Sequence, residues 1–74
     1  MTNLSQIKAG CKVKIIFIQG CKSTVYRLTE MGLLLGEKIT MSYNEGSGPV
    51  TIFVKGTKLS IGHGLAEKIK VREV

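Results

Sequence analysis

The sequence predicts a small all-β domain, a closed or nearly closed barrel of about five strands with one short helix after the first strand. Three observations lead to this fold class. Short apolar segments alternate with a period of two residues, and clusters of turn residues separate them at regular spacing. A chain of 74 residues with 43% hydrophobic residues also has enough apolar side chains for one small core. We therefore expect a single domain over residues 1–74.

The alternation predicts which side chain of each strand points inward. In the first strand, over residues 12–18, it places Val13, Ile15 and Phe17 on the buried face. The later strands are predicted to bury a similar apolar set: Ile39, Met41, Tyr43, Val50, Ile52, Val54, Leu59, Ile61, Ile69 and Val71. Of the four aromatic residues, only Phe53 is clearly expected to face outward.

A glycine-bounded run of leucines follows the predicted helix. The helix is expected over residues 23–31 with Ser23 as its N-cap, and Gly32 suits the left-handed position after a helix. Three leucines then separate Gly32 from Gly36. This segment is too short for a core strand or helix and too apolar for an ordinary solvated loop. We expect some of these leucines to pack and the others to bind a partner.

Composition narrows the function classes. Eleven Lys and Arg residues against five Glu give a net charge of +6, which suits acidic proteins, nucleic acid or anionic lipid as partners. The longest apolar run, residues 15–18, is far shorter than the roughly 20 residues of a membrane span. No signal peptide is recognised, so we expect a cytoplasmic protein. With no Asp and one His, a Ser-His-Asp arrangement is not available, and we expect no enzymatic activity.

Metal binding has weak support in the sequence. Cys11 and Cys21 would lie about 30 Å apart along a strand, which is too far for a disulfide or a shared metal ion. Non-haem ferrous sites use two histidines and a carboxylate, whereas this chain has only His63, which we expect in a surface loop between Gly62 and Gly64. His63 and Cys21 are therefore weak candidates for Fe²⁺ or another divalent metal, and we expect no bound cofactor.

Several short motifs follow one another along nearly the whole chain: Leu4-Ser5, Gly10, Ile18-x-Gly20, Arg27-Leu28-x-x-Met31-Gly32-Leu33-x-x-Gly36, Ile39, Gly48-Pro49-Val50, Gly56-x-x-Leu59-x-Ile61 and Ala66-x-x-Ile69-x-Val71. This pattern resembles the FeoA family, the small cytosolic proteins of bacterial ferrous-iron uptake. The same SH3-like module also occurs as the C-terminal domain of iron-dependent repressors of the DtxR type. The chain departs from the family at Leu35, where proline is common, and at residues 62–64, where relatives usually carry charged residues.

The resemblance implies a cytosolic accessory or regulatory protein that binds FeoB, a membrane ferrous-iron transporter with a cytoplasmic GTPase domain. We expect partner contacts at Arg27, Leu33, Leu34, Leu35 and Phe53, and membrane association only through that partner. Two alternatives remain. One is a basic barrel that binds nucleic acid, disfavoured because few outward rings are expected for base stacking. The other is a metal-responsive module that binds a transition metal ion. A homo-oligomer is also open, since an apolar turn and a hairpin edge can pair symmetrically, and the effect on the transporter is not fixed by the sequence.

Overall fold

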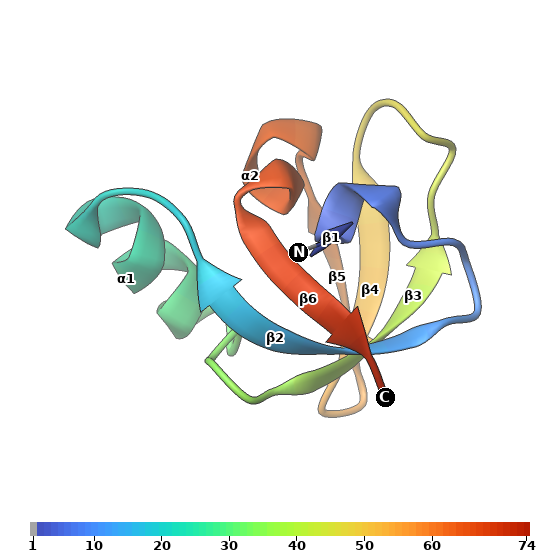
Figure 1. The fold of residues 1–74 in the computed structure, drawn as a ribbon, viewed down its shortest axis with the longest axis horizontal. Coiled ribbons are helices and arrows are strands. Elements are labelled where there is room, and N and C mark those ends of the chain that lie inside the picture. Colours follow the sequence, from blue (N-terminus) through green and yellow to red (C-terminus); the bar gives the residue numbers. More distant parts are fainter. Residues whose placement is uncertain (1) are drawn as a thin grey trace.

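A six-stranded antiparallel sheet forms most of the molecule (Figure 1). The computed structural model describes residues 2–74, so Met1, the first residue of the predicted domain, lies outside the described residues. The strands are β1 (Thr2–Asn3), β2 (Lys12–Ile18), β3 (Lys38–Tyr43), β4 (Val50–Val54), β5 (Thr57–Ile61) and β6 (Ile69–Glu73). The helical elements are a 3₁₀ turn, η1 (Leu4–Gln6), and two helices, α1 (Lys22–Glu30) and α2 (His63–Glu67).

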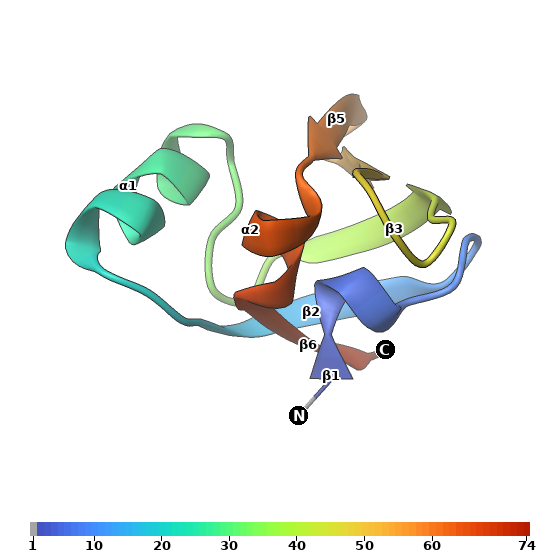
Figure 2. The same ribbon diagram turned by 90° about the horizontal axis from the view of Figure 1, so that it is seen from above.

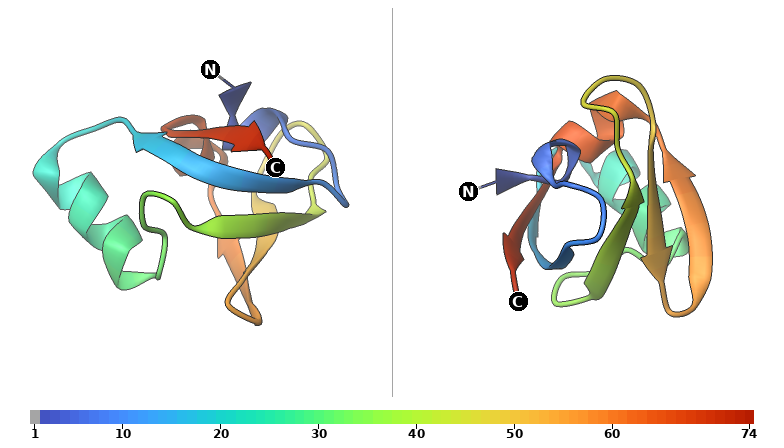
Figure 3. Two further views of the ribbon diagram at one scale, coloured as in Figure 1. Left: turned by 60° about the horizontal axis from the view of Figure 1, so that its bottom comes forward. Right: turned by 90° about the vertical axis from the view of Figure 1, so that its right-hand side faces the viewer.

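The mostly β prediction is confirmed, but the element count is corrected. The sheet order is β1-β6-β2-β3-β4-β5, and it includes a short first strand that the sequence analysis did not predict. In residues 2–74 no ladder joins β5 to β1, so the sheet is curved and open rather than shown to close into a barrel (Figure 3). A second helix, α2, packs against η1 and β6, while α1 extends away from the sheet at one end (Figure 2).

One apolar core lies inside the curve of the sheet. Each strand except β1, both helices and η1 contribute buried side chains, and these are Leu4, Ile7, Val13, Ile15, Leu28, Leu33, Ile39, Met41, Val50, Ile52, Val54, Ile61, Ala66, Ile69 and Val71. Ten of the thirteen side chains that the alternation placed inward are in this set, with Leu59 partly buried beside it. The core therefore follows the period-two pattern closely.

Phe17 was predicted to face inward, and this prediction was wrong. Ile15 pairs with Val71, but Phe17 pairs with Lys70, so Ile16 is an extra residue in β2. A bulge of this kind reverses the alternation after it. Phe17 consequently lies on the outer face with 48% of its surface exposed.

Tyr43 was predicted inward for the same reason and is corrected in the same way. Met41 pairs with Ile52, whereas Tyr43 pairs with Thr51, so Ser42 is the extra residue in β3. The bulge turns the Tyr43 ring outward, where 51% of its surface is exposed.

Two local predictions around the helices were also wrong. Helix α1 begins at Lys22 with Cys21 in the N-cap position, so Ser23 is inside the helix rather than its cap. Helix α2 begins at His63 after Gly62, so the predicted surface loop is the first turn of a helix. His63 is half-buried there.

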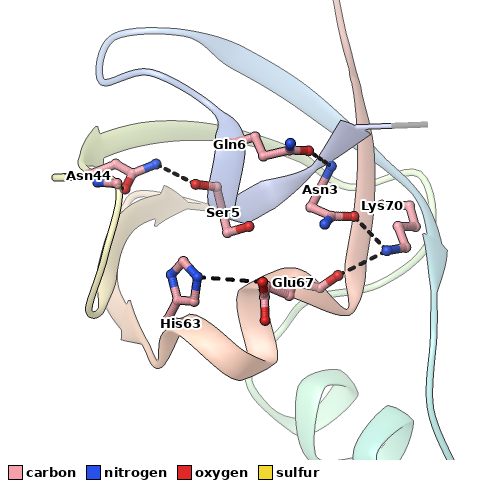
Figure 4. A network of polar contacts seen from close by, with 8 residues as sticks. Asn3, Ser5, Gln6, Asn44, His63, Glu67 and Lys70 are labelled. Carbon is pink, nitrogen blue, oxygen red and sulfur yellow. Dashed lines mark hydrogen bonds and ion pairs between the residues drawn. The ribbon is translucent and has the colours of Figure 1, made fainter.

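Polar contacts fix the N-terminal segment to the sheet (Figure 4). Asn44 Nδ2, in the loop after β3, donates a hydrogen bond to the Ser5 carbonyl at 2.9 Å. Lys70 Nζ donates to Asn3 Oδ1 and, at 3.0 Å, to the Glu67 carbonyl. These contacts join β1, η1, α2 and β6 into one side of the molecule, so Lys70 is engaged within the fold.

Two glycine substitutions separate backbone conformation from packing. A Cβ at Gly32 or at Gly64 would meet no atom within 4 Å, but Gly32 has φ +90° and Gly64 lies within α2. We expect Gly32→Ala to destabilise the protein by about 1–2 kcal/mol, because L residues avoid this conformation. Gly64→Ala should stabilise it by about 0.5–1 kcal/mol through helix propensity. Urea unfolding measures both changes. Equal changes in the free energy of unfolding for the two variants would contradict the left-handed conformation of Gly32 and the helical position of Gly64.

Candidate functional site

The leucine turn, defined here as residues 32–37, begins with a Schellman motif at the end of α1. The Gly32 N–H donates to the Thr29 carbonyl at 2.9 Å, and the Leu33 N–H donates to the Leu28 carbonyl at 2.9 Å. Leu28 and Leu33, whose contact commonly accompanies this motif, are both fully buried in the core. Leu33, one of the predicted partner-binding residues, therefore anchors the turn from inside the molecule.

The second half of the leucine turn is hydrogen-bonded to β2. The Glu37 N–H donates to the Leu34 carbonyl at 3.0 Å, and Gly36 has φ +87°, as the third position of a type II turn requires. The Gly36 N–H donates to the Ile15 carbonyl at 2.7 Å, and the Ile15 N–H donates to the Glu37 carbonyl at 3.0 Å. The turn is thus held at one end by α1 and at the other by a core strand.

Leu34 and Leu35 project from this anchored turn into solvent. Leu35 is 66% exposed and Leu34 is 40% exposed, in contrast to the fully buried Leu33. Arg27, in the last turn of α1, is also exposed, and its carbonyl accepts the Met31 N–H at the helix end that leads into the turn. Arg27, Leu34 and Leu35 therefore all lie near the junction of α1 and the leucine turn. We call these three residues the apolar tip.

Phe53 belongs to a different surface from the apolar tip. It lies on the outer face of β4, opposite Thr40 in β3 and Lys58 in β5. The Lys58 ammonium stands 5.4 Å from the centroid of its ring. The outward direction of Phe53 was predicted from alternation, but its position among the strands depends on pairing that the sequence does not show.

Tyr26 is an exposed ring that the sequence analysis did not single out. It lies in α1 directly before Arg27, with 64% of its surface exposed. The helical period was the available signal, because Tyr26 falls off the stripe that buries Leu28.

The two metal candidates lie on different helices and do not form a site together. His63 Nε2 is 3.5 Å from Glu67 Oε2 within α2 (Figure 4), whereas Cys21 is at the N-cap position of α1. His63 Nδ1 is buried and has no hydrogen-bond partner. Within residues 2–74, no three His, Cys, Asp or Glu side chains are grouped so that they could hold a metal ion.

Cys21 has an unusually acidic thiol for a fully exposed residue. Its Sγ lies 3.0 Å from the Ser23 hydroxyl and 3.6 Å from the Thr24 hydroxyl. These side-chain hydrogen bonds, with backbone hydrogen bonds from the same two residues, lower the pKa of Cys21 to about 6. The lowered pKa favours the thiolate form of Cys21.

An open hollow of about 590 Å³ lies between the N-terminal segment and strands β2 and β6. Ile7, Ile16 and Val71 contribute apolar surface to it, and Lys8, Arg72 and Glu73 contribute charges of both signs. None of the predicted site residues lines this hollow.

The class of protein follows from the fold and the exposed turn: a small β-rich module that presents an anchored apolar turn beside a curved sheet. None of its helices within residues 2–74 is long and apolar enough to cross a membrane. The family model described as the FeoA domain matches residues 2–73. The chain belongs to the FeoA family, whose members are non-enzymatic accessory proteins.

Individual relatives agree with this assignment. The "Putative Fe(2+) transport protein A" of Methanocaldococcus jannaschii is 37% identical over 73 residues, which cover 99% of this chain and 88% of the relative. The crystal structure of "Iron Uptake Regulatory Protein (FeoA)" matches with a TM-score of 0.93 and 33% identity, covering 99% of this chain and 97% of that one. The NMR structure of a FeoA-like protein from Clostridium acetobutylicum matches with a TM-score of 0.85 and 25% identity, covering 100% and 91%.

The same fold occurs inside a larger regulator. The metal-dependent transcriptional regulator MtsR matches with a TM-score of 0.86 and 18% identity, and the match covers 99% of this chain but 36% of the regulator. At this identity the likeness concerns the fold alone.

The titration of Cys21 is directly measurable. In a Cys11→Ser background, we expect the rate of alkylation of Cys21 by iodoacetamide to rise with pH around a midpoint of about 6. Ser23→Ala should move this midpoint upward, because the Ser23 hydroxyl makes the largest contribution to the lowered pKa. If the protein that keeps Ser23 has a midpoint near the ordinary pKa of a cysteine thiol, this result would contradict the hydrogen bonds that Cys21 makes with Ser23 and Thr24.

Proposed function

We propose that this chain is a cytoplasmic accessory protein of ferrous-iron uptake, and that it binds a FeoB-type transporter through the apolar tip. The observation that carries the proposal is the exposure of Leu34 and Leu35 on a turn fixed by the core. Membership of the FeoA family and the ferrous-transport name of the Methanocaldococcus relative support the link to iron. The protein would reach the membrane through this partner.

Physical chemistry favours the apolar tip as a contact surface. Each square ångström of apolar surface removed from water contributes roughly 25 cal/mol, and an already ordered turn loses little conformational entropy on binding. Leu34 and Leu35 would enter an apolar pocket of the partner, while Leu33 holds the turn in place. Arg27 and the net charge of +6 would orient the tip toward an acidic surface.

Co-purification with the transporter tests the proposal. The tagged protein is purified from detergent-solubilised membranes of cells that contain the transporter, and the bound transporter is quantified. We expect the double variant Leu34→Ser/Leu35→Ser to lose the transporter, because the variant removes the two exposed side chains that would enter the partner. Phe17→Ser/Val74→Ser is the matched control, since it removes two other exposed apolar side chains and should retain binding.

The variant Leu35→Pro removes the leucine side chain but keeps the backbone of the turn. Proline suits the second position of a type II turn, and in the structure the Leu35 N–H donates no hydrogen bond. This variant should remain folded, with a gain of about 0.4–1 kcal/mol in stability, and should bind less transporter than the unsubstituted protein. Undiminished binding by a folded Leu34→Ser/Leu35→Ser protein would overturn the proposal, and equal loss in the matched control would show that the tip is not specific.

A further inference from the structure

The outer face of strands β2 to β5 carries a row of residues that the apolar tip does not use. In the observed register Lys12 lies opposite Thr40, Thr40 lies opposite Phe53, and Phe53 lies opposite Lys58. These four residues therefore form one row across four neighbouring strands, on the face away from the core. A lysine stands at each end of the row, and an aromatic ring lies between them.

A second row places another ring beside the first. Tyr43 lies opposite Thr51, and Thr51 lies opposite Ser60. Since Thr51 is two residues from Phe53, the two rings are diagonal neighbours on adjacent strands, with Cα atoms about 7–8 Å apart. Tyr43 is 51% exposed and Phe53 is 41% exposed, so both rings are accessible to solvent.

Further cations extend this surface along β2. Lys14 lies opposite Lys38 in β3 and opposite Arg72 in β6. The basic face is defined here as these residues together with the two rows: Lys12, Lys14, Lys38, Thr40, Tyr43, Thr51, Phe53, Lys58, Ser60 and Arg72. It contains five cations and no carboxylate.

Carboxylates occur only at the margins of the basic face. Glu37, the last residue of the leucine turn, is paired with Lys55 at 3.5 Å. Glu45, in the loop after β3, raises the pKa of the neighbouring Tyr43. Glu73 follows Arg72 at the end of β6. The positive potential of the rows is therefore not cancelled from within them.

We propose that the basic face binds single-stranded nucleic acid, with its lysines and Arg72 on phosphates and with neighbouring bases stacked on Phe53 and Tyr43. A positively charged sheet surface with rings on adjacent strands offers both contacts that sequence-independent single-strand binding uses. Thr40, Thr51 and Ser60 add hydroxyl groups between the rings and the lysines. Lys58, now above the Phe53 ring, would move to a phosphate as a base takes its place.

The structure removes the objection that the sequence raised against this partner. Only Phe53 was clearly expected outward, but all four aromatic residues are between 41% and 64% exposed. Charge alone would fit an acidic protein equally well. Two accessible rings within the rows favour bases, because every base has a face that can stack on a ring.

Fluorescence anisotropy with labelled oligonucleotides tests the inference. The probes are thymidine and uridine homopolymers of about 15 nucleotides, within the range of known single-strand site sizes. Binding is measured between about 50 and 200 mM salt, where the slope of log K against log salt reports about 0.7 per phosphate contact. We expect binding of at least one probe, with a slope set by the cations of the basic face.

Matched variants connect the binding to this surface. Phe53→Leu and Tyr43→Leu should each weaken it by about fivefold or more, the equivalent of one stacked base. Tyr26→Leu removes an exposed ring of α1 and should have no effect. Lys12→Gln/Lys58→Gln should reduce the salt slope by about 1.4. A control variant that loses the same two charges elsewhere, Lys8→Gln/Lys22→Gln, should leave the slope unchanged.

Each other outcome overturns the proposal. Failure to bind either probe at the lower salt concentration excludes single-stranded nucleic acid. Displacement by a polyglutamate peptide of equal length, together with unchanged binding by folded Phe53→Leu and Tyr43→Leu proteins, identifies a surface for acidic protein instead. Equal losses in the basic-face variants and their controls show only nonspecific charge attraction. Thermal unfolding of every variant establishes that it is folded, and the apolar-tip variants should bind the probes normally.

Discussion

The attachment of the leucine turn to both α1 and β2 determines which of its leucines are buried and which are exposed. Leu33 and Leu28 are both buried in the core, and the Ile15 backbone of β2 exchanges hydrogen bonds with Gly36 and Glu37 of the turn. Once Leu33 is fixed inside, the next two leucines must leave the core, because the turn closes within four residues. The three leucines are thereby divided between the core, which holds Leu33, and the surface, where Leu34 and Leu35 are exposed on an ordered turn.

The two outward surfaces differ in the interaction they offer. The apolar tip would bind through burial of hydrophobic side chains, which depends little on salt and is strengthened by the rigidity of the turn. The basic face would act through long-range attraction, which depends strongly on salt. Lys55 reaches Glu37 at the end of the leucine turn, so the β4–β5 hairpin lies beside the turn.

The sequence was sufficient for features that depend on local period and backbone preference. Alternation identified the buried residues of β4 and β6, and the position of Gly32 identified the end of α1. It failed at Phe17 and Tyr43, because a bulge is set by pairing with a distant strand and leaves the local pattern unchanged. The grouping of the basic face likewise depends on register across four strands.

Amide hydrogen exchange of the free protein tests the anchored turn most directly. The amides of Leu33 and Gly36 donate hydrogen bonds to the carbonyls of Leu28 and Ile15. The account predicts that these two amides exchange slowly, at rates similar to those of the amides in the core strands. The amides of Leu34 and Leu35 donate no hydrogen bond in the structure and should exchange rapidly. Rapid exchange of Gly36 and Leu33 as well would show that the turn is a loose loop and would contradict a preformed apolar tip.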